Sequence, residues 1–202
     1  MDWTLGSQGE TQGGLGAVTV VLTVGHGARS AEALVTLLQQ ADVTTLIDIR
    51  RFPGSRRHPQ FGREALAVSL ASAGIRYDWQ GEQLGGRRDG QASSRHSALT
   101  DAAFRGYADH MDTPAFRHAV EALIARADAG ERLAVMCAET LWWRCHRSLV
   151  ADALMCRGVE VVHPLDLNRR EPHRRRPTMR CDDDGWPVYD VSDTLPLETK
   201  NL

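Results

Sequence analysis

The chain has 202 residues, of which 42% are hydrophobic and 25% charged, and its net charge at pH 7 is -2. These values exclude a disordered chain and a uniformly basic packaging protein, and they are typical of one soluble domain with a single core. All but one of the 24 Lys and Arg residues are arginine. Either genome composition or a role in binding phosphate or carboxylate groups, which arginine does better than lysine, explains this bias.

Three features of the sequence bear on the cellular compartment. The longest apolar run, residues 133–138, is far shorter than the roughly 20 residues that cross a bilayer. The first 16 residues carry acidic groups and glycines where a signal peptide has basic and apolar regions. The four cysteines (Cys137, Cys145, Cys156 and Cys181) include no C-x-x-C pair. We therefore expect a cytoplasmic protein that has no membrane partner and keeps all four cysteines reduced.

The hydrophobic pattern predicts alternating strands and helices after a flexible arm at residues 1–17. Strands are expected at residues 18–24, 45–49, 75–79, 132–137 and 159–163. Helices are expected from the Ser30 cap to residue 41 and at residues 63–73, 104–111, 114–129 and 144–157. Residues 80–103 are predicted to form a long polar connection, and residues 167–202 a polar C-terminal tail.

This alternation predicts a single α/β domain at residues 18–166. We expect an open, mainly parallel sheet with helices on both faces, Rossmann-like, and long polar loops at the carboxyl ends of the strands. Ligands of such sheets bind beyond the carboxyl ends of the strands. The rule selects His26, Asp48, Arg50, Cys137 and Glu139 as candidate site residues.

Six groups of residues form an ordered set of motifs. They are TVGH (23–26), IDIR (47–50), PGSRR with PQF (53–57 and 59–61), LGG (84–86), FRGY (104–107), and MCAE with CHR (136–139 and 145–147). The set, spread over about residues 21–165, resembles the bacterial family called domain of unknown function 488. The resemblance implies a compact α/β domain with polar motifs on its loops, and it implies no particular reaction, substrate or cofactor.

Cys137 closes a predicted strand, and Cys145, His146 and Arg147 open the next helix. A helix start favours anions, and with Arg144 and Arg147 it would lower the pKa of a nearby thiol and make Cys137 a nucleophile. The alternative is that Cys137 is a buried apolar residue. Cys145 is expected either in the core or packed just under the cleft, while Cys156 is expected in the core and Cys181 on the surface as an ordinary thiol.

Asp48 and Glu139 are candidate catalytic carboxylates. Each could act as a general base, and Asp48 could accept a hydrogen bond from a ribose hydroxyl, but an ion pair with a nearby arginine that holds the loop explains either one equally well. His146 is either a catalytic base or a semi-buried histidine. We predict no metal site, because no Cys or His pair has ligand spacing on one element, and no cofactor.

The remaining candidates form an arginine cluster on the loops. The predicted anion-binding residues are Arg50, Arg56, Arg57, Arg144, Arg147, His26 and His146. A second loop carries Arg87, Arg88 and Arg95. We expect an anionic small molecule or nucleotide as partner, bound by an enzyme with Cys137 at its centre; the alternative is a non-catalytic module that binds nucleic acid. The sequence does not indicate an oligomeric state.

Overall fold

The protein, seen here as a computed structural model that describes residues 18–54 and 56–190, contains one six-stranded sheet and a separate hairpin. The strand order is β3-β2-β4-β1-β5-β6. The parallel strands are β1 (Val20–Gly25), β2 (Thr45–Asp48), β3 (Arg76–Trp79), β4 (Leu133–Cys137) and β5 (Glu160–Pro164). β6 (Arg170–Pro172) pairs antiparallel with β5. The expected α/β fold with an open, mainly parallel sheet is confirmed.

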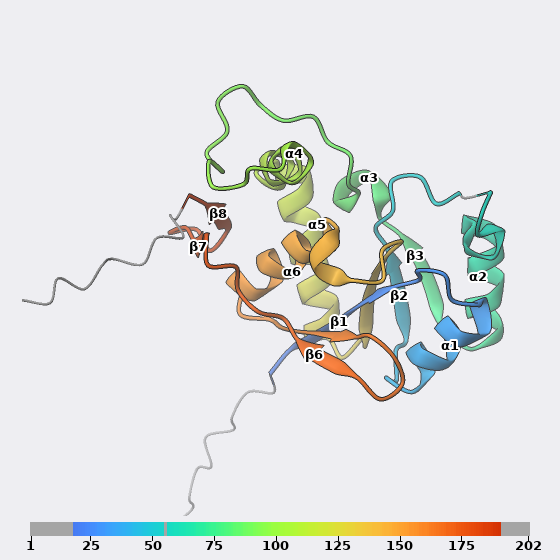
Figure 1. The fold of residues 1–202 in the computed structure, drawn as a ribbon. Helices are drawn as coiled ribbons and strands as arrows, with labels where there is room; N and C mark the ends of the chain where they lie inside the picture. The colour runs from blue at the N-terminus through green and yellow to red at the C-terminus, as the bar shows by residue number, and fades with distance from the viewer. Residues whose placement is uncertain (1–17, 55, 191–202) are drawn as a thin grey trace, which may run out of the picture.

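Helices cover both faces of this sheet (Figure 1). One face carries α1 (Ala31–Gln39) and α2 (Arg63–Ser72), and the other carries α4 (Ala102–Met111), α5 (Pro114–Asp128) and α6 (Arg147–Cys156). Successive residues of a strand point to opposite faces, so neighbouring residues of β2 and β4 join different cores. Leu46 packs in the α1–α2 core, whereas Ile47 packs against α5 and α6.

Side-chain caps fix several helix starts. The Ser30 hydroxyl accepts a hydrogen bond from the Ala33 amide, and the Thr113 hydroxyl accepts one from the Phe116 amide. The Asp101 carboxylate accepts from two amides and starts α4 two residues before the position expected from the sequence. These bonds satisfy amides that the first turn of a helix leaves without a partner.

Two expected loops contain short helices. The connection at residues 80–103 includes α3 (Gly81–Leu84), and η1 (Pro59–Phe61) precedes α2. The helix expected from residue 144 begins at Arg147, because η2 (Trp142–Arg144) is a 3-10 turn and Cys145 is extended. Arg144 therefore lies outside the N-terminus of α6.

Residues 167–190 are part of the fold. β6 extends the sheet, and β7 (Met179–Cys181) and β8 (Pro187–Tyr189) form an antiparallel hairpin. Met179, Trp186 and Tyr189 are buried, and the Tyr189 carbonyl accepts a hydrogen bond from the Ala98 amide. The folded unit thus reaches residue 190 instead of ending at residue 166. The expected arm at residues 1–17 and the last part of the expected tail, residues 191–202, lie outside the described residues.

A disulfide joins Cys156, at the end of α6, to Cys181 in β7. The expectation of four reduced cysteines is wrong for this pair, since the hairpin brings together two residues that are 25 positions apart. Cys137 and Cys145 are free thiols. Among the described residues, no helix combines the length and the apolar character that crossing a membrane requires.

We predict that a chain ending at Asn168 melts at least about 5 °C below one ending at Asp190, because buried side chains such as Trp186 each stabilise the fold by roughly 1.5–3 kcal/mol. Both chains lack residues 191–202, so the comparison isolates residues 169–190. Circular dichroism melting of the two chains measures the difference. Equal melting temperatures would show that the C-terminal strands contribute nothing to stability.

Candidate functional site

The order of the strands creates a crevice between β1 and β4. These two strands are neighbours, with Gly25 opposite Cys137 at their carboxyl ends. The chain leaves β1 toward α1 on one face of the sheet and leaves β4 toward α6 on the other face (Figure 1). Because the two connections diverge, the space above Gly25 and Cys137 stays open, as at the ligand sites of other open α/β sheets.

Backbone contacts hold the two loops together at this point. The His26 amide donates to the Cys137 carbonyl at 3.1 Å, and the Gly27 amide donates to the Ala138 carbonyl at 2.8 Å. A Cβ atom at Gly25 would lie 1.8 Å from the Glu139 carbonyl oxygen. Only glycine therefore fits at position 25, and the β4–α6 loop packs directly on the end of β1.

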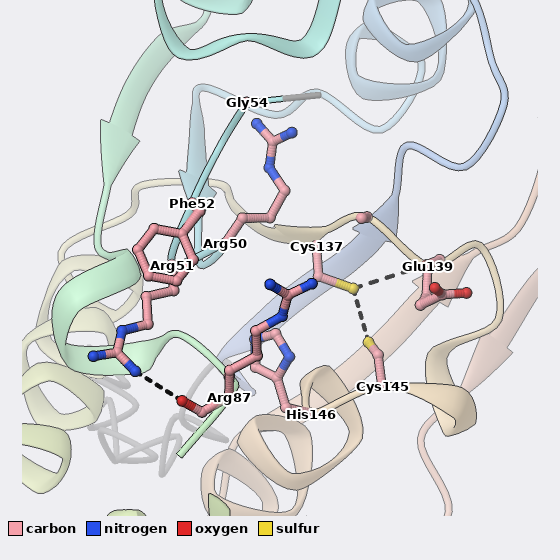
Figure 2. A pocket seen from close by; sticks show the side chains of 11 residues that line it. Arg50, Arg51, Phe52, Gly54, Arg87, Cys137, Glu139, Cys145 and His146 are labelled. Carbon is pink, nitrogen blue, oxygen red and sulfur yellow. Dashed lines mark hydrogen bonds between the residues drawn. The ribbon is translucent and has the colours of Figure 1, made fainter. Parts of the chain in front are cut away.

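Two adjoining pockets form a cleft over this crevice. Arg50, Phe52, Gly54, Arg87, Ala138 and Glu139 line both pockets. The first, of about 290 Å³, we name the thiol pocket; it also contains Arg51, Gly86, Cys137, Cys145 and His146 (Figure 2). The second, of about 470 Å³, we name the histidine pocket; it also contains His26, Gly27, Ala28, Arg57, His58 and Thr140.

The candidate residues divide into three groups by position. The cleft brings together Arg50, Arg57, His26, His146, Cys137 and Glu139. Asp48 and Arg147 are buried and line neither pocket. Arg56 and Arg144 are exposed and also line neither. The cleft also contains Arg51, Arg87 and Cys145, which the predicted site residues do not include, because the sequence does not indicate which loop residues point into the cleft.

Asp48 is fully occupied as a hydrogen-bond acceptor. Its Oδ1 accepts from the Arg50 backbone amide at 3.0 Å and from Arg50 Nε at 2.8 Å. Its Oδ2 accepts from Arg50 Nη2 at 2.5 Å and from the Tyr77 hydroxyl at 2.7 Å. Of the two interpretations of Asp48, this geometry favours the ion pair. The carboxylate fixes the Arg50 guanidinium at the base of both pockets.

Two of the histidines that line the cleft, His26 and His146, are neutral at pH 7. His26 Nδ1 donates to the Gly27 carbonyl, and its Nε2 accepts from Arg50 Nη1 at 3.3 Å. Burial, with Arg50 as a further cause, lowers the pKa of His26 to about 4. His146 Nε2 donates to the Ile49 carbonyl at 3.3 Å, and burial lowers its pKa to about 4. The positive charge of the cleft therefore comes from its arginines.

Cys137 and Cys145 meet at the base of the thiol pocket (Figure 2). Their sulfur atoms lie 2.7 Å apart, and both residues are at most 8% exposed. Burial opposes ionisation of Cys137, but the hydrogen bond from Cys145 and the positive charge of Arg147 outweigh it and lower its pKa. The same hydrogen bond and burial raise the pKa of Cys145. Cys137 is thus the more acidic thiol of the pair, and Cys145 is the more basic one.

Arg147 is a buried cation beneath the loop that connects β4 to α6. Its side chain is 1% exposed, and Nη2 donates to the Thr140 carbonyl at 3.1 Å. Within residues 18–54 and 56–190, Nε and Nη1 have no hydrogen-bond partner, and no carboxylate lies within 4.0 Å of the guanidinium. A buried charge is costly without a counter-charge. The positive charge of Arg147 in turn lowers the pKa of the Cys137 thiol.

Arginines surround the mouth of the cleft. Arg51 Nη1 donates to the Arg87 carbonyl at 2.7 Å, and Arg51 Cζ lies 5.4 Å from the Phe52 ring centre. Arg87 has a φ of 58°, and its side chain extends over the thiol pocket (Figure 2). Glu139 is the single carboxylate among the described residues that line the two pockets. Among the described residues, four arginines and one carboxylate therefore line the cleft, which gives it a positive charge.

Together the fold and the site define an α/β protein with an arginine-lined cleft and a thiol pair between β1 and β4. The family model described as domain of unknown function DUF488 matches residues 30–154, more than half of the chain, and the protein belongs to this family. No curated protein and no solved structure matches it. In the described part of the chain, no three His, Cys, Asp or Glu side chains are grouped as metal ligands.

We predict that Asp48→Asn lowers the free energy of unfolding by about 3 kcal/mol or more, because it leaves the buried Arg50 guanidinium without its counter-charge. Tyr77→Phe, which removes one neutral donor, is the control and should cost about 1 kcal/mol. Urea unfolding measures both values. An Asp48→Asn loss no larger than that of Tyr77→Phe would contradict the assigned role of the ion pair.

We also predict that the protein becomes less stable as the pH falls from 7 to 4. His26 and His146 have folded-state pKa values of about 4, below the 6.5 of an unfolded chain, so the unfolded state binds more protons in this range. Each histidine then removes up to about 1.4 kcal/mol per pH unit. NMR titration of the ring protons provides the site-specific measurement, and a midpoint near 6.5 for either ring would refute the assignment.

Proposed function

We propose that the protein is a thiol-dependent enzyme that binds a small anionic substrate in the cleft and attacks it with Cys137. The observation that carries the proposal is the contact of the Cys137 and Cys145 sulfur atoms at the base of an arginine-lined pocket, where the buried charge of Arg147 helps to lower the pKa of Cys137. Enzymes activate cysteine nucleophiles by placing a positive charge beside the sulfur.

The composition of the cleft supports an anionic substrate. Arg50, Arg51, Arg57 and Arg87 line it, against one carboxylate from Glu139. Arg50 is held rigidly by Asp48, so its orientation is set before a ligand binds. The substrate is expected to carry phosphate or carboxylate groups, because the guanidinium fork pairs with both.

The dimensions of the cleft support a small molecule. Pockets of about 290 and 470 Å³ fall in or near the range of known ligand sites. Phe52 is 66% exposed at the mouth and offers a face on which a base could stack, so a nucleotide fits the same chemistry. We also propose the cytoplasm as its compartment, since a free thiol pair requires reducing conditions; the Cys156–Cys181 disulfide would be an exception there.

A non-catalytic nucleic-acid-binding module is the second candidate. The exposed arginines at positions 51, 56, 57 and 87 and the exposed ring of Phe52 favour it. Such a module neutralises several phosphates, so its affinity would fall steeply with salt concentration. Fluorescence anisotropy of a labelled single-stranded oligonucleotide at increasing salt tests this alternative, and an absence of binding at low salt removes it.

The proposed enzyme is tested by the rate of iodoacetamide labelling at pH 6 to 7, followed by peptide mapping. We predict that Cys137 is labelled before Cys145, because Cys137 carries the lower thiol pKa. Inorganic phosphate should slow labelling of Cys137, and Arg87→Gln should weaken that protection. Arg144→Gln is the matched control, since Arg144 lies outside the cleft. Labelling of Cys137 only after denaturation would overturn the proposal.

A further inference from the structure

We infer that Cys145 is the resolving thiol for Cys137, and that the pair exchanges with small disulfides that carry carboxylate groups. This inference rests on the proposed function, in which Cys137 is the nucleophile, and it names the substrate class. The observation behind it is the contact of the two sulfur atoms in the same pocket, 2.7 Å apart.

The geometry favours a disulfide between the two residues. Their sulfur separation exceeds an S–S bond by only about 0.7 Å. Cys137 ends β4, and Cys145 lies in extended backbone just before α6, so neither sulfur is held within a helix. Closing the bond requires a small displacement of the loop between them, residues 138–144.

The two thiols are also chemically unequal in the way that exchange requires. Cys137 attacks first as the thiolate, because the hydrogen bond from Cys145 and the charge of Arg147 give it the lower pKa of the two thiols. Cys145 keeps its proton in the hydrogen bond to Cys137 and can transfer it once Cys137 has formed a bond to substrate sulfur.

The shortage of available bases in the thiol pocket favours sulfur exchange over hydrolysis. A cysteine hydrolase needs a base that activates water. His146, the histidine of the thiol pocket, bonds to the Ile49 carbonyl, and His26 is engaged through both ring nitrogens, which leaves Glu139 as the carboxylate of the thiol pocket that a hydrolase would need. Asp48 has both oxygens occupied by Arg50 and Tyr77. Thiol–disulfide exchange needs no activated water, because the resolving thiol takes that role.

The reaction then proceeds in two steps. The Cys137 thiolate attacks one sulfur of the substrate, the substrate S–S bond breaks, and the first product leaves with the electron pair as a thiolate. Cys145 sulfur next attacks Cys137 sulfur in the mixed disulfide, and the second product leaves as a thiolate. The Cys145 proton passes to one of the two products. The protein dithiol is oxidised to a disulfide, and the substrate disulfide is reduced to two thiols.

The charge of the cleft selects the substrate. Arg51 and Arg87 at the mouth would pair with carboxylate groups on the disulfide, whereas a cationic disulfide would be repelled. Oxidation of Cys137 also removes the counter-charge of Arg147. The reduced pair is therefore favoured, and an excess of small thiol restores it.

The test uses the full chain with Cys137 and Cys145 reduced and the Cys156–Cys181 disulfide intact. Oxidised glutathione, which is anionic, and cystamine, which is cationic, are added separately, and mass spectrometry with peptide mapping follows the products. With oxidised glutathione we expect loss of two hydrogen atoms and a Cys137–Cys145 linkage. Cys145→Ser should accumulate a mixed disulfide at Cys137, and Cys137→Ser should form no adduct at Cys145.

Arg87→Gln should slow the reaction with oxidised glutathione about tenfold, the effect of one lost charged hydrogen bond, and should not slow that with cystamine. Arg144→Gln should change neither rate. A stable glutathione adduct on Cys137 beside a free Cys145 overturns the resolving role but leaves the nucleophile intact. Equal rates for the two disulfides overturn the substrate class. An unreactive Cys137 in the wild-type protein overturns the inference and the proposed function together.

Discussion

The site depends on one buried charge. Arg147 begins α6 with its guanidinium beneath the β4–α6 loop, next to Gly25 and the Glu139 backbone, and no described carboxylate pairs with it. A cation in this position is costly unless an anion accompanies it. In the proposed function the Cys137 thiolate fills that role, so the interaction that stabilises the loop would also make the sulfur nucleophilic. Ionisation of Cys137 would therefore affect both the stability of the β4–α6 loop and the reactivity of the thiol.

The strand order determines where the Arg147 charge and the cleft lie. Since β1 and β4 are neighbours whose following helices lie on opposite faces, their loops separate above Gly25 and Cys137. At the end of β2, the ion pair of Asp48 with Arg50 fixes the guanidinium that lines the adjoining side of the cleft. The end of β1 thus contributes the close-packed turn at Gly25, the end of β2 contributes the fixed guanidinium of Arg50, and the end of β4 contributes the thiol of Cys137.

The elements with strong local signals were predictable from the sequence. The apolar run at residues 45–49 and the capping residues Ser30 and Thr113 predicted β2 and two helix starts correctly. The C-terminal strands were not predictable, because each is three residues long. The side chains buried in this segment, such as Met179 and Trp186, are too widely spaced to form a periodic pattern. For the same reason the Cys156–Cys181 disulfide was missed. The contact of Cys137 with Cys145 depends on the 3-10 turn at η2, which leaves no periodic pattern.

The central claim is that Arg147 holds Cys137 as a thiolate. Ultraviolet absorbance of the thiolate during a pH titration tests it most directly, in a Cys145→Ser background that leaves one free thiol. We expect ionisation below the pKa of an ordinary cysteine, about 8.5. Arg147→Met should raise the midpoint, and Arg147→Lys, which keeps the charge, should restore part of the shift. A midpoint at or above the ordinary value in the presence of Arg147, or one that Arg147→Met leaves unchanged, would contradict the account.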